Sequence, residues 1–377
     1  MWGLTWFVGG LRCATPNVGG ESRKCLHVYS RMEKRSMISK LFPSLLLMVV
    51  LPFSHTFAVA QDAPVRAPES QTAPTPRAPV PEKPFQLLAI TPEFWKIFSK
   101  DAKLETMGAG FKFTEGPVWD RANVLWVSDE KGNQIVKLYP DGHTETMISV
   151  IDPDGSTYDR DHRLWSTSSG LRAVIELSPD GKSFQVIADQ YEGKKLNTPN
   201  DIVMGPDGAI YFTDPIIDLR RDQQQEQPQS VYRLAADHTL TLLTRELLAP
   251  NGLAFSPDGK YLYIDDGKLK GIRRYDFHKD GTISGGILFG DMKDPVNRGG
   301  PDGMKLDKHG RLFVSGPNGI WVFNSKGEHI GTVQMPHSMA NLAWGGPDYS
   351  KLYIAAGNTV YILQTKTHGF IPYEKKK

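Results

Sequence analysis

Six polar residues recur along this 377-residue chain at a spacing that could build one metal site. Each lies ten or eleven residues before a short apolar strand signature such as LWVSD or IYFTD. Their side chains carry carboxylate or amide oxygens, the ligands that hard divalent cations prefer. They are Glu115, Asp154, Asn200, Asn251, Asp302 and Asn341. If the repeats place them at one height around a channel, they form a ring of oxygens suited to a cation.

Three members of this ring are acids, Glu115, Asp154 and Asp302. Acids this close together repel one another unless a cation neutralises them or one of them binds a proton. The sequence contains no H-E-x-x-H or C-x-x-C motif, so the oxygens favour Ca²⁺, with Mg²⁺ or Mn²⁺ as alternatives and Zn²⁺ as a weaker one. Two carboxylates that hydrolyse a glycoside are another alternative. The amides beside the acids favour the metal interpretation.

The strand signatures themselves repeat at 39 to 52 residues, the period of a propeller blade. They begin at Leu125, Leu164, Ile210, Leu262, Leu312 and Leu352. The sequence therefore predicts an all-β, six-bladed β-propeller over residues 85–377, in which the ring residues open the innermost strand of each blade. Thr91-Pro92-Glu93 predicts a short N-terminal helix before it, extending to Lys100.

Tight turns are predicted where Pro-Asp-Gly directly precedes a signature strand, at 206–208 and 257–259. Pro301-Asp302-Gly303 is spelled in the same way but lies ten residues before its strand, at the ring position. The register therefore predicts that Asp302 belongs to the site and not to a turn.

The N-terminal 60 residues are predicted to be an upstream extension and a cleavable signal peptide. Basic residues precede the apolar run Leu41–Phe53, and Ala58-Val59-Ala60 is a small-x-small cleavage site. A membrane anchor is the alternative, but the run is interrupted by prolines and is short for a span. Residues 61–84 are rich in Pro and Ala and predict an extended linker. We expect export to the periplasm or the medium.

Cleavage would also change the charge of the protein. Residues 1–60 hold both cysteines, seven Lys or Arg and two Asp or Glu, so the counts fall from 44 and 42 to 37 and 40. The formal charge then moves from +2 to −3. Nothing basic remains that would indicate nucleic acid binding. We expect a monomer with no stable membrane insertion after cleavage.

Four motifs at blade spacing resemble one family of six-bladed propellers, the senescence-marker-protein/gluconolactonase/luciferin-regenerating family. They read FTEGPVW, LNTPNDIV, APNGLAFSPDGKYLYIDD and GGPDGMKLDKHGRLFV. The resemblance implies one divalent cation in the channel, commonly calcium, bound by Glu115, Asn251 and Asp302. Asn200 would contribute to the metal shell or bind substrate. It further implies hydrolysis of a sugar lactone or related cyclic ester, with Asp302 also acting as the acid–base.

Substrate recognition is where this chain departs from the family pattern. Animal members that act on sugar lactones have an arginine two residues before the Asn-Asp motif, and here that position is Thr198. Asn297 and Arg298, just upstream of Asp302, are candidates to replace it. His337 lies on a predicted rim loop and is a candidate proton shuttle.

Other polar residues are expected to have supporting roles. Asp154 and Asn341 should line the channel without binding the cation, because no family motif puts a ligand in their blades. Acids that close signature strands, such as Asp129, Asp214 and Asp265, are expected to cap turns. Two other classes of protein remain as alternatives. One is a non-enzymatic ligand-binding propeller that retains the cation, and the other is a metal-free propeller enzyme resembling strictosidine synthase.

Overall fold

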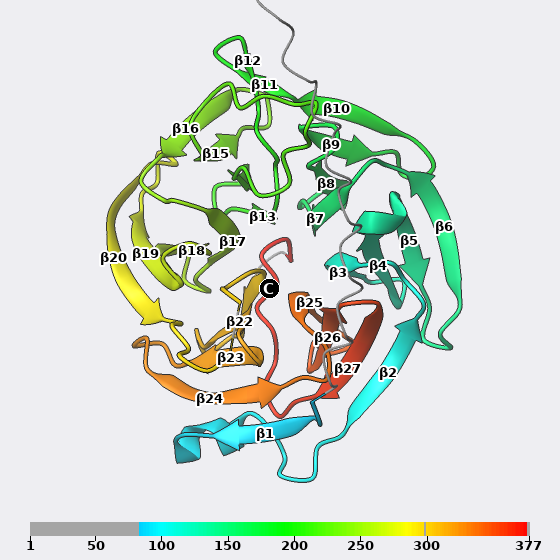
Figure 1. Ribbon diagram of the computed structural model, residues 1–377, viewed down its shortest axis with the longest axis vertical. Helices are drawn as coiled ribbons and strands as arrows, with labels where there is room; N and C mark the ends of the chain where they lie inside the picture. The colour runs from blue at the N-terminus through cyan, green and yellow to red at the C-terminus, as the bar shows by residue number, and fades with distance from the viewer. Residues whose placement is uncertain (1–82, 298, 375–377) are drawn as a thin grey trace, which may run out of the picture. The chain divides into compact units, whose positions relative to one another are not determined.

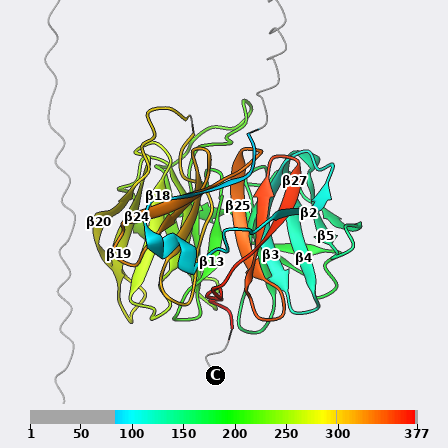
Figure 2. The same ribbon diagram turned by 90° about the horizontal axis from the view of Figure 1, so that it is seen from below.

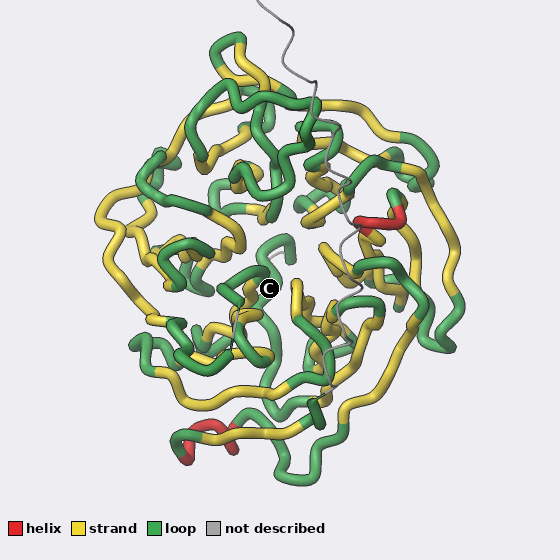
Figure 3. The backbone as a smooth tube through the Cα atoms, in the orientation of Figure 1, coloured by secondary structure: helices red, strands yellow, loops and turns green. Residues whose placement is uncertain are grey.

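Six antiparallel sheets stand around a central axis in the computed structural model, which describes residues 83–297 and 299–374 (Figure 1). The all-β, six-bladed propeller predicted from the sequence is confirmed. The predicted signal peptide, nearly all of the linker and Arg298 lie outside the described residues. Among the described residues, helix is confined to two short 3₁₀ turns. Figure 3 shows strands and loops almost everywhere else in this part of the chain. No helix in the described part of the chain is long and apolar enough to cross a membrane.

Each blade begins with its innermost strand. The first two blades comprise β3 (Thr114–Asp120), β4 (Val124–Asp129), β5 (Gln134–Leu138) and β6 (Thr144–Ser149), and then β7 (Pro153–Tyr158), β8 (Leu164–Ser168), β9 (Ala173–Leu177) and β10 (Phe184–Ala188). The next two comprise β13 (Ile202–Met204), β14 (Ile210–Asp214), β15 (Ser230–Leu234) and β16 (Leu240–Thr244), and then β17 (Pro250–Phe255), β18 (Tyr261–Asp266), β19 (Gly271–Phe277) and β20 (Ile283–Asp291). A small hairpin, β11 (Gln190–Tyr191) and β12 (Lys194–Lys195), precedes the third blade.

The last two blades take strands from both ends of the described chain. Blade five contains β21 (Met304–Leu306), β22 (Leu312–Gly316), β23 (Gly319–Phe323) and β24 (His329–Gln334), with β1 (Gln86–Ala89) added at its outer edge. Blade six contains β25 (Met339–Gly345), β26 (Lys351–Ala356) and β27 (Thr359–Gln364), and its outer strand is β2 (Leu104–Ala109). The pairing of β2 with β27 joins the N-terminal strand to the last three strands and closes the ring.

The signature strands are the second strands of their blades, and they are almost entirely buried because blades pack against both faces. The Pro-Asp-Gly turns fall between the first and second strands, as predicted. Their glycines Gly208 and Gly259 have φ of 87° and 73°, a conformation that most other residues avoid.

The predicted N-terminal helix is present but shorter than expected. It is a 3₁₀ helix, η1 (Pro92–Lys96), and the Thr91 hydroxyl makes no capping hydrogen bond. The segment is held by burial of Phe94, Ile97 and Phe98, none of which is exposed. Packing against β1 and β24, and not a cap, therefore fixes this turn.

One end of the channel is filled by the C-terminal segment, which crosses the centre of the propeller (Figures 1 and 2). Tyr373 is buried there and donates from its hydroxyl to the Trp119 carbonyl at 3.1 Å. The Phe370 amide donates to the Leu306 carbonyl at 2.9 Å. Trp119 and Leu306 lie at the ends of their inner strands that are remote from the ring residues, so the ring is approached from the opposite end.

Candidate active site

All six ring residues lie at the entry of an innermost strand. Four are within strands: Glu115 in β3, Asp154 in β7, Asn251 in β17 and Asn341 in β25. Asn200 and Asp302 come two residues before β13 and β21. The register inferred from the spacing therefore corresponds to one level of the propeller.

Local irregularity turns these side chains toward the axis. In the four blades whose ring residue is within a strand, the pairing with the second strand shifts register at or beside that residue. Such bulges redirect side chains at the rims of closed β structures. Gly116, which follows Glu115, has φ of 49°, and a Cβ there would lie 2.0 Å from the Asp154 carbonyl oxygen. Glycine therefore allows neighbouring inner strands to approach closely at the ring.

Hydroxyl groups in the second strands hold neighbouring blades together at the same level. Ser128 donates to the carbonyl of Asp154, and Thr213 donates to the carbonyl of Asn251, both at 2.7 Å. Each donor is completely buried. The backbone that carries Asp154 and Asn251 is therefore fixed by the preceding blade, which the sequence analysis did not anticipate.

Five ring residues meet at a cavity of about 220 Å³, which we call the inner cavity. Its wall consists of Phe113, Glu115, Glu130, Lys131, Asp154, Asn200, Ile217, Asp218, Asn251 and Asp302. Asn341 is not among these lining residues. It lies behind Glu115 and donates from Nδ2 to Glu115 Oε2 at 3.1 Å.

Glu115 and Asp154 are buried and Asp302 is partly buried, and the charges of these three acids oppose one another's ionisation. Burial, with the nearby charge of Asp302, raises the pKa of Glu115 well above its usual range. Burial and the charge of Glu115 do the same to the pKa of Asp154. Burial, followed by the charge of Asp201, raises the pKa of Asp302 to about 8. Ionising all three together therefore requires a compensating positive charge.

Hydrogen bonds leave one oxygen of Glu115 for a ligand. Its Oε2 accepts from the Gly116 amide at 2.6 Å as well as from Asn341. The orientation of the Asn341 amide is fixed because its Oδ1 accepts from Lys305 Nζ at 3.1 Å and from the Leu342 amide at 2.9 Å. With Oε2 engaged in this way, Oε1 is the atom that can bind a ligand in the inner cavity.

The two ring amides that line the cavity also pair with acids. Asn200 donates from Nδ2 to Asp154 Oδ2 at 2.8 Å. A hydrogen bond from Asn251 lowers the pKa of Asp302, although burial outweighs it. Asn251 Oδ1 is buried and has no hydrogen-bond partner among the described residues. An unsatisfied buried carbonyl oxygen is unfavourable without a ligand, so Asn251 Oδ1 is suited to bind a cation.

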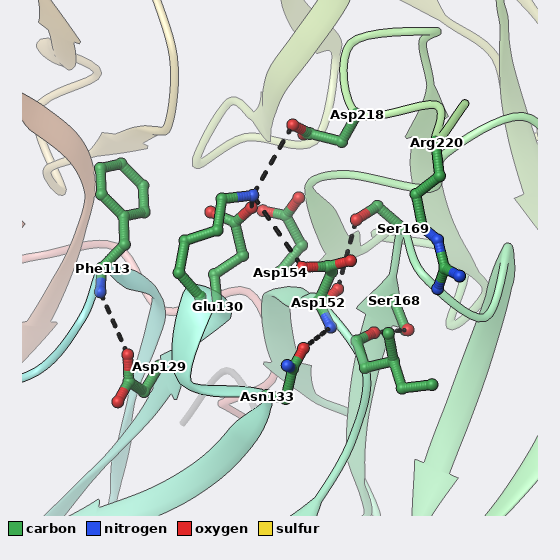
Figure 4. Close-up of polar contacts among 12 residues, drawn as sticks. Phe113, Asp129, Glu130, Asn133, Asp152, Asp154, Ser168, Ser169, Asp218 and Arg220 are labelled. Carbon is green, nitrogen blue, oxygen red and sulfur yellow. Dashed lines mark hydrogen bonds and ion pairs between the residues drawn. The ribbon is translucent and has the colours of Figure 1, made fainter. Parts of the chain in front are cut away.

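A second acidic group lies at the mouth of the inner cavity (Figure 4). Glu130, in the turn η2 (Glu130–Gly132), forms an ion pair with Lys131. Lys131 Nζ also lies 3.9 Å from carboxylate oxygens of Asp152 and Asp218. Burial raises the pKa of both Glu130 and Asp218. Lys131 therefore offsets the negative charge above Asp154.

Beyond the ring, a wider opening of about 1020 Å³, the outer cleft, adjoins the inner cavity. Asp302 and Ile217 line both. His337 and Asn297 line the outer cleft, and His337 Nδ1 lies 2.9 Å from the Tyr361 hydroxyl. Thr198 lines neither space, because it is buried and its hydroxyl donates to the Pro215 carbonyl at 2.6 Å.

Residues 113–358 match the sequence pattern of a protein family that is described as the SMP-30/Gluconolactonase/LRE-like region. The chain belongs to the SMP-30/gluconolactonase/LRE-like family. It is 31% identical to the gluconolactonase of Zymomonas mobilis over 318 residues, covering 75% of this chain and 87% of that protein. The solved structure of a gluconolactonase from Xanthomonas campestris superposes with a TM-score of 0.69 at 30% identity, covering 77% of this chain and 99% of that one.

A more distant solved structure shares the fold. The calcium-binding protein regucalcin from Agrobacterium tumefaciens has a TM-score of 0.60 at 19% identity, covering 71% of this chain and 99% of that one. The family membership inferred from the four motifs is thus confirmed. The roles of the individual site residues remain predictions.

In the present protein, Asp129 and Asp265, which close signature strands, accept hydrogen bonds from backbone amides of nearby loops. Asp129 accepts from the amides of Lys112 and Phe113 at 2.9 and 3.1 Å. Asp265 accepts from the Gly252 amide at 3.1 Å. These contacts hold the loops around the ring in place, which agrees with the structural role expected for such acids.

Proposed function

We propose that this protein is a divalent-cation-dependent hydrolase that opens a lactone ring at the inner cavity. Family membership and the 31% identity to a gluconolactonase support the reaction class. The observation that supports a cation is Asn251 Oδ1, which is buried beside three acids of raised pKa and has no hydrogen-bond partner in the described part of the chain. Because all these groups offer oxygen, Ca²⁺ is the favoured ion, ahead of Mg²⁺, Mn²⁺ or Zn²⁺.

The ligand set that we propose is Glu115 Oε1, Asn251 Oδ1 and a carboxylate oxygen of Asp302, with Asn200 beside them. In the described residues, no three His, Cys, Asp or Glu side chains converge into a metal cluster. The proposed set includes the amide oxygen of Asn251 as well as acids. Asp154, whose Oδ2 is engaged by Asn200, is assigned to the wall of the cavity.

A divalent cation bound here would polarise the lactone carbonyl and promote ionisation of a water molecule. In this proposal Asp302 takes the proton from the attacking water, and its place in the walls of both the inner cavity and the outer cleft supports that role. The same carboxyl can then return the proton to the ring oxygen as the ester bond breaks.

The proposal is tested with purified protein, a panel of lactones, and cation removal and return. We expect hydrolysis that chelator abolishes and added Ca²⁺ restores. Hydrolysis that is unaffected by thorough chelation would contradict the cation dependence. Tight Ca²⁺ binding without turnover of any lactone would favour the ligand-binding alternative.

A further inference from the structure

Large apolar side chains gather unusually at the outer cleft. Ile216, Ile217, Leu248 and Val296 all line it and are 37%, 49%, 49% and 84% exposed. They come from three separate loops, those between β14 and β15, between β16 and β17, and between β20 and β21. An exposed apolar patch that rims a cavity marks a site where an apolar ligand is bound.

The floor of the cleft is also apolar. Met335 and Met339 line it while being only 2% and 7% exposed, and Pro301 and Pro336 lie beside them. Methionine side chains adapt their shape to different apolar ligands. The two lysines that line the cleft are Lys83 and Lys268. Lys83 is engaged by two side-chain carbonyls, because its Nζ donates at 2.6 Å to Asn297 Oδ1 and to Asn318 Oδ1.

The apolar surface is continuous with the proposed reaction centre. Ile217 lines both the inner cavity and the outer cleft, as does Asp302. A lactone whose carbonyl lies beside Asp302 would therefore direct its substituent across Ile217 toward Leu248. The outer cleft, at about 1020 Å³, is at the upper end of the roughly 300–1,000 Å³ typical of sites for drug-sized ligands.

We propose that the outer cleft selects lactones bearing an extended apolar substituent, such as an alkyl chain on the ring carbon next to the ring oxygen. This inference rests on the proposed function. The lactone ring occupies the inner cavity, and the alkyl chain covers Ile217, Leu248 and the methionines. Ile217 and Leu248 are then the specificity-determining residues, because they border the path from the inner cavity.

The test measures kcat/KM for γ-lactones with alkyl substituents from methyl to hexyl, with glucono-1,5-lactone as the polar reference. Burial of each methylene predicts a rise of about three- to fourfold in kcat/KM until the cleft is filled. The double variant Ile217→Ser/Leu248→Ser should lower the ratio of the hexyl to the methyl lactone by about tenfold or more. A serine pair at Ile287 and Leu288 is the matched control, since these residues are 54% and 63% exposed on the outer strand β20.

We expect the control pair to retain the wild-type chain-length profile. A flat profile in the wild type, with glucono-1,5-lactone hydrolysed efficiently, would overturn this inference and leave the proposed function intact. An equal loss of chain-length preference in both double variants would also overturn it. Failure to hydrolyse any lactone, with or without Ca²⁺, would instead reject the proposed function and this inference with it.

Discussion

Asp302 is assigned two roles, and replacing it with asparagine separates them. Asp302→Asn retains the shape and one oxygen ligand but removes the charge and the basicity. If Asp302 is the proton acceptor, turnover should fall by about 10²- to 10⁴-fold even when the cation site is saturated. The loss of cation affinity should be a separate effect that added Ca²⁺ overcomes.

The structure also predicts how the affinity of Asp302 for a cation depends on pH. Its pKa is raised to about 8, so at neutral pH the cation must displace a proton from this carboxyl. Each pH unit below about 8 should therefore weaken Ca²⁺ binding by about tenfold through Asp302 alone. In Asp302→Asn this contribution disappears, and the dependence of affinity on pH should become shallower.

The assay combines kcat on an active lactone at several Ca²⁺ concentrations with direct calorimetric titration of Ca²⁺ at two pH values. Asn251→Asp is the matched control, because it keeps an oxygen ligand and adds charge. It should bind Ca²⁺ at least as tightly as the wild type and lose less activity than Asp302→Asn. If excess Ca²⁺ returned Asp302→Asn to near wild-type kcat, Asp302 would be a ligand only, and the base would have to be sought elsewhere in the ring.

Three further outcomes are expected. Burial raises the pKa of Asp214 to about 7. The folded state therefore retains a proton that the unfolded state loses above about pH 4, and the free energy of unfolding should fall as pH rises from about 4 to 7. Between pH 5 and pH 8 this amounts to about 2 pH units, so Asp214→Asn should remove about 2.7 kcal/mol of the pH dependence measured by urea unfolding. An unchanged pH dependence in the variant would contradict the assignment. Gly303→Ala would place a Cβ 2.0 Å from Asn341 Cγ. The free energy of unfolding should therefore fall by about 1–3 kcal/mol, and Ca²⁺ should bind more weakly. A variant with the stability of the wild type would argue against a rigid Asn341. N-terminal sequencing of exported protein should begin at Gln61, whereas recovery of the uncleaved apolar run in a membrane fraction would reject the predicted cleavage after Ala60.

Much of the fold could be predicted because propeller blades are local structures. Each blade is a run of consecutive antiparallel strands joined by short turns, so Pro-Asp-Gly and the apolar signatures determine the pairing within a blade. The spacing therefore identified the entry positions of all six inner strands, including Asp302, whose Pro-Asp-Gly spelling alone would indicate a turn. The length of η1 could not be predicted, since burial of Phe94, Ile97 and Phe98, and not a side-chain cap at Thr91, holds this segment in place.

Which side chains meet around the inner cavity depended on the tertiary structure. Lys131 lies near Asp218, which is 87 residues later in the chain, and the two approach only because separate blades meet at the axis. The contact between Asn341 and Glu115 spans 226 residues and depends on closure of the ring. Sequence spacing counts positions within each repeat, and it holds no information about which side chains from different repeats will touch.

The same division applies to the chemistry. The sequence by itself determined that acids and amides recur at one level, because residue type and register are local properties. Only the tertiary structure decided that Asn251 Oδ1 is buried and has no hydrogen-bond partner among the described residues, and that the pKa of Asp302 is raised. It also decided that apolar loops from different blades surround the outer cleft. Burial and electrostatic coupling arise from what surrounds a group in space, and that environment exists only once all six blades are packed around one axis.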